Sequence, residues 1–170
     1  MSTVARRAFL SLGSNVGDRA AHLRHGREAL AALTGTRLLG SSRIYETAPQ
    51  ELEDQPVFLN QVVCVETVLP PSTLLAAAQS TEAAEGRERR VRFGPRTLDV
   101  DILLIEDHQS DDPALTVPHP RMWQRAFVLV PLAEVWSLAR GMPAEDVPAL
   151  ARDLAAQQPV AVFGGAEAER

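Results

Sequence analysis

The sequence predicts an α+β protein of the ferredoxin-like type, a βαββαβ sandwich with an antiparallel sheet, helices packed on one face and extra C-terminal elements. The first observation is the order of the segments. Apolar, β-branched runs and helical segments follow one another as β-α-β-β-α-β. The other is size: 170 residues, 45% of them apolar, suffice for one domain with its own core. We assign residues 1–160 to this domain and expect 161–170 to form a flexible tail.

The first half of the predicted fold is a strand, a helix and a second strand. Residues 8–12 are apolar and end at a Gly-Ser-Asn turn. Asp18 can cap a helix that ends at Gly35. Residues 38–47 are expected to form the second strand. The polar, Pro-bounded stretch 48–56 is long enough to be a functional loop.

The second half begins with the most regular strand of the chain. Residues 58–69 are rich in β-branched residues, and two prolines end the run and open a helix that reaches about Glu85. An arginine-rich loop at 87–96 leads into a strand at 98–105. Residues 127–136 are predicted to be a strand followed by a short helix.

The remaining C-terminal element is a helix expected between Asp146 and about Gln158, with Asp146 at its start. The chain contains no internal repeat and no linker that would divide it.

Composition excludes several classes of protein. A net charge of −5 argues against non-specific nucleic-acid binding, which needs a basic surface. The single cysteine, Cys64, lies in an apolar run and is expected to be an inert core residue. No apolar stretch reaches the length of a membrane span, and the N-terminus lacks a signal-peptide pattern. We expect a monomeric, cytoplasmic protein.

All 17 basic residues are arginine. A GC-rich genome favours arginine codons and explains this over most of the chain. Arginine also offers a planar fork of donors that matches phosphate, which lysine does not. The arginines between 87 and 125 are therefore candidates for a chemical role.

The strongest local motif is Leu-Asp-Val-Asp-Ile at residues 98–102. Side chains two positions apart in a strand share a face, so Asp99 and Asp101 lie together with Cα atoms about 6.5 Å apart. Two carboxylates at this spacing suit Mg²⁺, which binds oxygen ligands and substrate phosphates. The alternative is a pair of solvent-facing aspartates on an amphipathic strand.

The arginine loop favours the metal interpretation. Five arginines lie within residues 87–96, directly before the two aspartates, in a segment that also contains Gly94 and Pro95. A carboxylate-held metal beside guanidinium groups is the arrangement that a nucleoside triphosphate requires. We therefore expect phosphate binding here, with a solvated charge run as the alternative.

Three weaker patterns remain open. Gln79 and Glu82 share a helix face, which is either a solvated surface or part of a ligand site. His119 lies between two prolines and is either structural or a ligand contact. Phe58 and Asn60 share a strand face that either binds a flat heterocycle or is half-buried sheet surface.

Together these residues resemble the 6-hydroxymethyl-7,8-dihydropterin pyrophosphokinase family. The resemblance is carried by Arg-Phe-Gly-Pro-Arg-Thr-Leu-Asp-Val-Asp-Ile-Leu at 92–103, Leu-Gly-Ser-Asn at 12–15, and segments 45–47, 54–60 and 115–122. It extends over about residues 8–140. The family implies an ATP-dependent diphosphokinase with two Mg²⁺ ions, which transfers pyrophosphate from ATP to the hydroxymethyl group of the pterin and releases AMP in folate biosynthesis.

The resemblance also implies a role for each matching residue. Asp99 and Asp101 would bind the metal ions. The catalytic group would be Arg87, Arg89, Arg96, Asp99 and Asp101. The ATP site would contain Gln79, Glu82, Arg87, Arg92, Arg96, His119 and Arg125. The pterin site would contain Thr47, Ala48, Phe58, Asn60 and Phe127.

Two other functions remain as alternatives. A Mg²⁺-dependent nuclease or nucleotidyltransferase could use the same aspartates, although the Phe58 and Asn60 strand fits it poorly. A non-enzymatic ferredoxin-like ligand-binding or RNA-binding module would not need paired aspartates, and RNA binding would favour exposed aromatics, whereas only 5% of the residues are aromatic.

Overall fold

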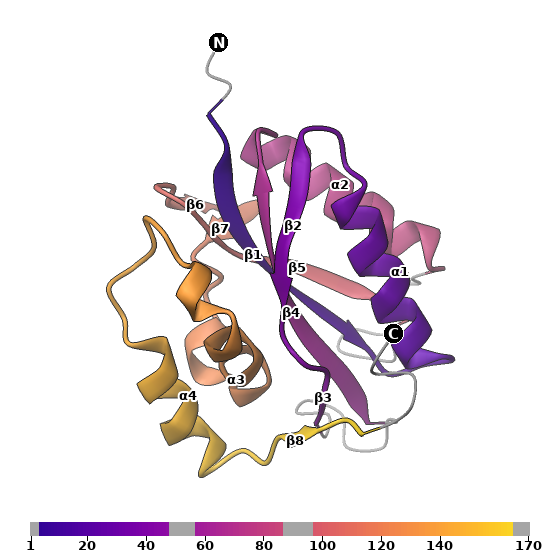
Figure 1. Cartoon of the computed structure of the whole chain (residues 1–170), viewed down its shortest axis with the longest axis vertical. Helices are drawn as coiled ribbons and strands as arrows, with labels where there is room; N and C mark the ends of the chain where they lie inside the picture. The colour runs from indigo at the N-terminus through magenta and orange to yellow at the C-terminus, as the bar shows by residue number, and fades with distance from the viewer. Residues whose placement is uncertain (1–3, 48–56, 87–96, 165–170) are drawn as a thin grey trace.

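The computed structural model describes residues 4–47, 57–86 and 97–164 (Figure 1). In chain order the elements are β1 (Arg6–Ser14), α1 (Arg19–Ala31), β2 (Thr36–Ser41), β3 (Tyr45–Thr47), β4 (Phe58–Thr67), α2 (Pro71–Ala84), β5 (Asp99–Ile105), β6 (Ser110–Asp112), β7 (Leu115–Val117), the 3-10 turn Met122–Gln124, α3 (Ala126–Glu134), the 3-10 turn Trp136–Leu138, α4 (Val147–Ala155) and β8 (Ala161–Val162). Ala48 and the arginines between 87 and 96, which were predicted to be site residues, lie outside the described residues.

One antiparallel sheet forms the centre of the molecule, with strand order β5-β1-β4-β3-β8 and with β2 also pairing β4. β2 lies along residues 63–67 of β4 and β3 lies along residues 58–60, so the two share one edge of that strand. β1 and β4 are central, and β5 is an edge strand. This arrangement confirms the predicted ferredoxin-like fold.

The sheet carries a separate apolar core on each face. Leu10 and Val63 belong to the core that α1 and α2 cover. Phe9 and Val62, their neighbours in the strands, belong to the opposite core, which Leu129 of α3 and residues of α4 complete. Figure 1 accordingly shows α1 and α2 on one side of the sheet and α3 and α4 on the other. The extra C-terminal elements thus supply a second helical layer.

Aspartate caps begin two of the helices at the predicted positions. The Ala21 N–H donates a hydrogen bond of 3.1 Å to Asp18 Oδ1 at the start of α1. The Ala149 N–H donates one of 3.1 Å to Asp146 Oδ1 at the start of α4. Each cap satisfies a backbone donor that has no partner within its own helix.

The prediction of one strand over residues 38–47 was wrong, because the stretch forms two strands, β2 and β3. Ser42 lies between them and bonds β4 with its side chain as well as its backbone. Its N–H donates to Val62 O at 2.8 Å, and its Oγ accepts from the Val62 N–H at 3.0 Å. Because the hydroxyl replaces a ladder carbonyl, the strand is interrupted here.

The prediction of a strand at the start of 127–136 was also wrong, because α3 occupies residues 126–134. A continuous apolar run fits either a buried strand or a helix buried on several sides. The helix is favoured because it buries Val128, Leu129 and Leu132 in the second core, between the sheet and α4.

The chain end also differs from the expected tail. Ala161 and Val162 form β8, which pairs with β3, and the Phe163 N–H donates to Ile44 O at 2.8 Å. Residues 161–163 therefore belong to the sheet edge. The rest of the expected tail, residues 165–170, lies outside the described residues.

Cys64 is fully buried in the second core, as predicted. Burial raises the pKa of its thiol to about 11, so the reactive thiolate is scarce at neutral pH. None of the helices in the described part of the chain is long and apolar enough to cross a membrane.

Candidate functional site

The two aspartates of β5 share one face, as predicted. Val100 and Ile102 alternate with them and are buried in the core under α1 and α2. Asp99 and Asp101 therefore point to the opposite face of the sheet, where both are half-buried. This face is the one on which α3 packs against β4.

The strand register places an amide in line with the first aspartate. Asp99 pairs with Gly13 of β1, and Gly13 pairs with Asn60 of β4. Residues that are directly opposite in antiparallel strands point to the same face, so these three positions form the Asp99–Gly13–Asn60 row. With neighbouring strands about 4.8 Å apart, the Cα atoms of Asp99 and Asn60 stand about 10 Å apart across the row.

Gly13 keeps the middle of the row free of a side chain. A Cβ at this position would lie 3.2 Å from Asn60 Oδ1 and 4.0 Å from Phe58 Cδ1. The first of these distances is tighter than ordinary van der Waals contact. A residue other than glycine would therefore displace the Asn60 side chain.

Asn60 is held by a buried neighbour. Its Nδ2 donates a hydrogen bond of 2.7 Å to Thr47 Oγ1, and both residues are buried. The bond orients the amide and joins β3 to β4. Phe58 lies two residues before Asn60 on the same face of β4. It is opposite Thr47 and is half-buried.

Helix α3 adds an aromatic and a cation to this face. Arg125 immediately precedes the helix, and its guanidinium carbon lies 5.3 Å from the centre of the Phe127 ring. Phe127 packs against the second core. Tyr45 of β3 donates a hydrogen bond to Glu134 at the end of the helix, which ties α3 to the sheet.

His119 is fixed beside these residues by its backbone and by one ring nitrogen. Its N–H donates to Leu103 O at 2.9 Å, and its Nδ1 accepts from the Arg121 N–H at 3.2 Å. Burial is the main cause that lowers the pKa of His119, and the positive charge of Arg125 lowers it further. The negative charge of Asp99 acts in the opposite direction and raises it. The neutral ring, with Nδ1 as an acceptor, carries its proton on Nε2.

Gln79 and Glu82 differ in their surroundings although they are one turn apart on α2. Gln79 is exposed, whereas Glu82 is buried. The Val100 N–H, between the two aspartates, donates a hydrogen bond of 2.8 Å to Glu82 Oε2. Glu82 thus satisfies a backbone donor on the edge strand and helps to position β5.

The donor set of β5 fits a magnesium ion. Two carboxylates on one face of a strand supply only oxygen ligands, and Mg²⁺ is commonly held by one or two carboxylates together with water and substrate phosphates. Asp99 and Asp101 are both partly accessible, which leaves room for those further ligands.

Two features of this site could not be found from single-strand patterns. The Asp99–Gly13–Asn60 row depends on the pairing register of three strands. The bond from Tyr45 to Glu134 joins residues 89 positions apart. The sequence singled out Asp99 and Asn60 separately, but the turn expected at Gly13 was wrong, because Gly13 and Ser14 belong to β1.

Comparison with known proteins identifies the family. Residues 9–137 match the family model described as 7,8-dihydro-6-hydroxymethylpterin-pyrophosphokinase. This region is most of the chain, and the chain belongs to this family.

Similar proteins are named for this pyrophosphokinase activity or for folate synthesis. A 2-amino-4-hydroxy-6-hydroxymethyldihydropteridine pyrophosphokinase of Methylorubrum extorquens is 49% identical over 129 residues, which cover 76% of this chain and 82% of that protein. One of Bacillus subtilis is 49% identical over 131 residues, covering 75% and 77%. A mitochondrial folate synthesis bifunctional protein of Pisum sativum is 40% identical over 141 residues, 82% of this chain but 27% of that protein.

Solved structures agree on the fold. A wild-type HPPK-DHPS structure from Plasmodium falciparum superposes with a TM-score of 0.67 and 14% sequence identity. The match covers 92% of this chain and 46% of that one. This chain therefore corresponds in fold to less than half of the longer parasite protein.

Proposed function

We propose that this protein transfers pyrophosphate from ATP to the hydroxymethyl group of 6-hydroxymethyl-7,8-dihydropterin, releases AMP, and thereby serves folate biosynthesis. Family membership supports the reaction. The Asp99–Gly13–Asn60 row supports the assignment to residues, because it sets a carboxylate of β5 and an amide of β4 on one face of the sheet, on either side of β1.

The pterin is proposed to bind at the Asn60 end of this row. An amide offers both donors and an acceptor, which complement the mixed donors and acceptors of an aminopyrimidinone ring. Thr47 orients that amide. Phe58 and Phe127 would flank the flat ring, and the backbone near Ala48 would complete the site.

The triphosphate is proposed to bind at the Asp99 end. Asp99 and Asp101 would hold two Mg²⁺ ions, which when bound polarise the phosphoryl oxygens and favour ionisation of the attacking hydroxyl. His119 would donate from Nε2, because its Nδ1 already accepts a hydrogen bond. Further contacts to ATP are assigned to Gln79, Glu82, Arg87, Arg89, Arg92, Arg96 and Arg125.

The chain's own residues then perform two tasks in the reaction: they orient the pterin and they neutralise charge on the phosphates. The hydroxymethyl group gives up its proton to water as its oxygen attacks the β-phosphorus. A new P–O bond forms, and the bond from that phosphorus to the bridging oxygen breaks, which releases AMP. Asn60 holds the nucleophile's ring in place, so the two substrates meet in line. Arg87, Arg89 and Arg96 neutralise charge on the phosphate oxygens as it moves toward AMP.

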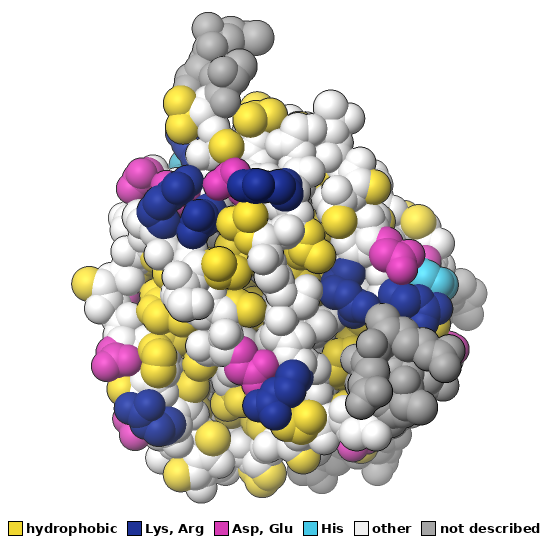
Figure 2. All heavy atoms as spheres, viewed as in Figure 1, with side chains coloured by type: hydrophobic (Ala, Val, Ile, Leu, Met, Phe, Trp, Pro, Cys, Tyr) yellow, Lys and Arg dark blue, Asp and Glu magenta, His cyan; other side chains and the backbone are white. Residues whose placement is uncertain are grey.

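The alternative functions are not favoured. A nuclease or nucleotidyltransferase would share the paired aspartates but would have no use for the buried Asn60–Thr47 pair. On the face in Figure 2, the coloured arginines lie near acidic side chains at several places and do not form one basic surface, which does not suit an RNA-binding module.

We also propose that the protein is a cytoplasmic monomer whose single domain extends over residues 1–160 and includes the edge strand β8 that follows. The exposed large apolar side chains among the described residues are four valines from four separate segments: Val4, Val57, Val68 and Val162. Scattered single residues of this kind are ordinary surface and do not form an interface.

Substitution of the aspartates tests the assignment of the site. Asp99→Asn and Asp101→Asn should each reduce pterin-dependent AMP formation by at least about 100-fold, a loss of about 2.7 kcal/mol of transition-state stabilisation. Asp111→Asn, at an exposed position in β6, is the matched control and should retain normal turnover. Near-normal rates in either β5 variant with Mg²⁺ present would contradict the metal assignment.

A further inference from the structure

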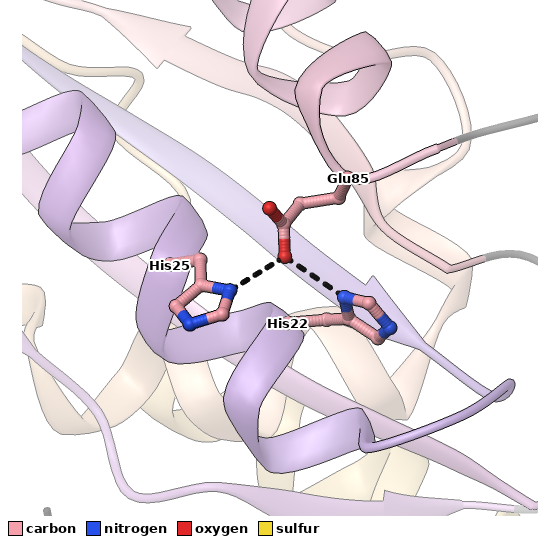
Figure 3. A group of neighbouring side chains, drawn as sticks. All are labelled: His22, His25 and Glu85. Atoms are coloured by element: carbon pink, nitrogen blue, oxygen red, sulfur yellow. Dashed lines mark hydrogen bonds and ion pairs between the residues drawn. The ribbon is translucent and has the colours of Figure 1, made fainter.

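A second group of metal-binding residue types lies on the other face of the sheet from the candidate site. His22 and His25 are one turn apart on α1, and Glu85 is the C-cap residue of α2 (Figure 3). Both helices cover the core opposite the face of Asp99 and Asp101. The ligand atoms of the three side chains lie within 4.8 Å of one another.

The three side chains converge on a single oxygen. His22 Nδ1 and His25 Nδ1 each lie 2.8 Å from Glu85 Oε1. Figure 3 shows both rings turned toward the carboxylate that lies between them. The side chains of His22 and Glu85 are 21% and 15% exposed, so two of the three groups are partly shielded from water.

The local backbone restricts the His22 ring. Gly17 precedes α1 with φ +74°, and a Cβ on it would lie 3.2 Å from His22 Nε2. Nε2 therefore faces the Gly17 backbone and Nδ1 faces Glu85. The His22 ring therefore presents Nδ1, and not Nε2, to Glu85.

The spacing of these atoms is close to that of a tetrahedral metal site. Two ligands at about 2.1 Å from a tetrahedral ion stand about 3.4 Å apart. The observed contacts of 2.8 Å would need to lengthen by about 0.6 Å, which side-chain rotation can supply. Two imidazoles and one carboxylate, with water in the fourth position, form a donor set that Zn²⁺ accepts and that Mg²⁺, which prefers oxygen, does not favour.

We propose that His22, His25 and Glu85 form a site for Zn²⁺ or a similar divalent transition-metal ion, separate from the magnesium site of β5. A bound ion joins α1 to the C-terminal end of α2. Because binding requires an unprotonated Nδ1 on each ring, it replaces the hydrogen bonds to Glu85. A charged ring releases its Nδ1 proton, and a neutral ring carries its proton on Nε2 instead. The inference does not depend on the proposed reaction.

The test is a calorimetric titration of the full chain with Zn²⁺ in excess Mg²⁺, which occupies the carboxylates of β5. One equivalent of Zn²⁺ should bind and should raise the melting temperature. His25→Asn keeps a side-chain donor at an exposed position but removes the imidazole, so the affinity should fall at least about tenfold, or about 1.4 kcal/mol. Glu85→Gln should weaken binding as well.

His108→Asn is the matched control, because His108 lies in the turn after β5 and outside the cluster. It should bind Zn²⁺ as the unaltered protein does. Circular dichroism establishes that each variant is folded. The proposal is overturned if no equivalent of Zn²⁺ binds, or if binding survives in His25→Asn and Glu85→Gln but is lost in Asp99→Asn, since the ion would then occupy the β5 site.

Discussion

Gly13 and Asn60 are directly opposite each other in β1 and β4, and a Cβ on Gly13 would lie 3.2 Å from Asn60 Oδ1. The close approach means that the shape of the proposed pterin site depends on the absence of a side chain at position 13. Their pairing also fixes the distance from the amide to Asp99, the next position along the row.

Gly13→Ala should therefore impair pterin binding more than it impairs folding. The added methyl displaces Asn60, and a loss of about 1.4 kcal/mol corresponds to a tenfold higher KM for the pterin. The KM for ATP should change much less. Gly164→Ala is the control, because nothing lies within 4 Å of a Cβ there. Equal changes for both substrates would argue against this role of Gly13.

Thr47→Val should produce a similar but smaller selective defect. The substitution keeps the shape of the side chain but removes the acceptor of the 2.7 Å bond from Asn60 Nδ2. The amide then loses its orientation. The buried donor left without a partner also lowers the stability of the fold by about 1–3 kcal/mol. Steady-state kinetics should show the rise in pterin KM, and Thr116→Val in β7 should leave it unchanged. An unaffected pterin KM in Thr47→Val would contradict the role given to this bond.

Glu82 and Gln79 should differ in what they contribute to the stability of the fold. Glu82→Ala removes the acceptor of the Val100 N–H and should lower the free energy of unfolding by about 1–3 kcal/mol. Gln79→Ala, on the exposed part of the same helix, should change it by less than about 0.5 kcal/mol. Urea denaturation measures both. Equal stability losses would show that Glu82 does not anchor β5.

Glu106 should make stability depend on pH. The hydrogen bond from Arg140 Nε at 2.7 Å is the main cause that lowers the pKa of this buried carboxyl, with a further bond from the Arg7 N–H. A lowered folded pKa means that the stabilisation is complete above the unfolded value of about 4.3 and is lost as the pH falls through the folded value.

Glu106→Gln should accordingly be destabilised by about 1 kcal/mol near neutral pH and progressively less in acid. The measurement is the free energy of unfolding in urea, at steps from about pH 7 to about pH 3. Glu28→Gln is the control, because Glu28 is exposed and its pair with Arg24 is 4.0 Å long. A difference from the unaltered protein that stays constant over this range would contradict the linkage.

Local patterns predicted the features that depend on neighbouring residues. Alternation along one strand placed Asp99 and Asp101 on a common face, and the capping preference of aspartate located the starts of two helices at Asp18 and Asp146. Those properties are encoded within a few consecutive residues. The family resemblance then supplied the roles that alternation alone could not.

Features set by distant contacts could not be predicted in this way. The break at Ser42 depends on a hydrogen bond to Val62, and α3 is a helix because its apolar run is buried between the sheet and α4. The cluster at Glu85 joins two helices whose residues are about 60 positions apart. Each requires the tertiary arrangement to be known first.

The most direct test of the central claim follows the fate of each phosphate. The protein is supplied with Mg²⁺, 6-hydroxymethyl-7,8-dihydropterin and ATP labelled at either the α or the γ phosphate. The account predicts that the γ label passes to a pterin diphosphate while the α label appears in AMP, in equal amounts and only when the pterin is present. Formation of α-labelled ADP with a pterin monophosphate, or release of phosphate without pterin, would contradict it.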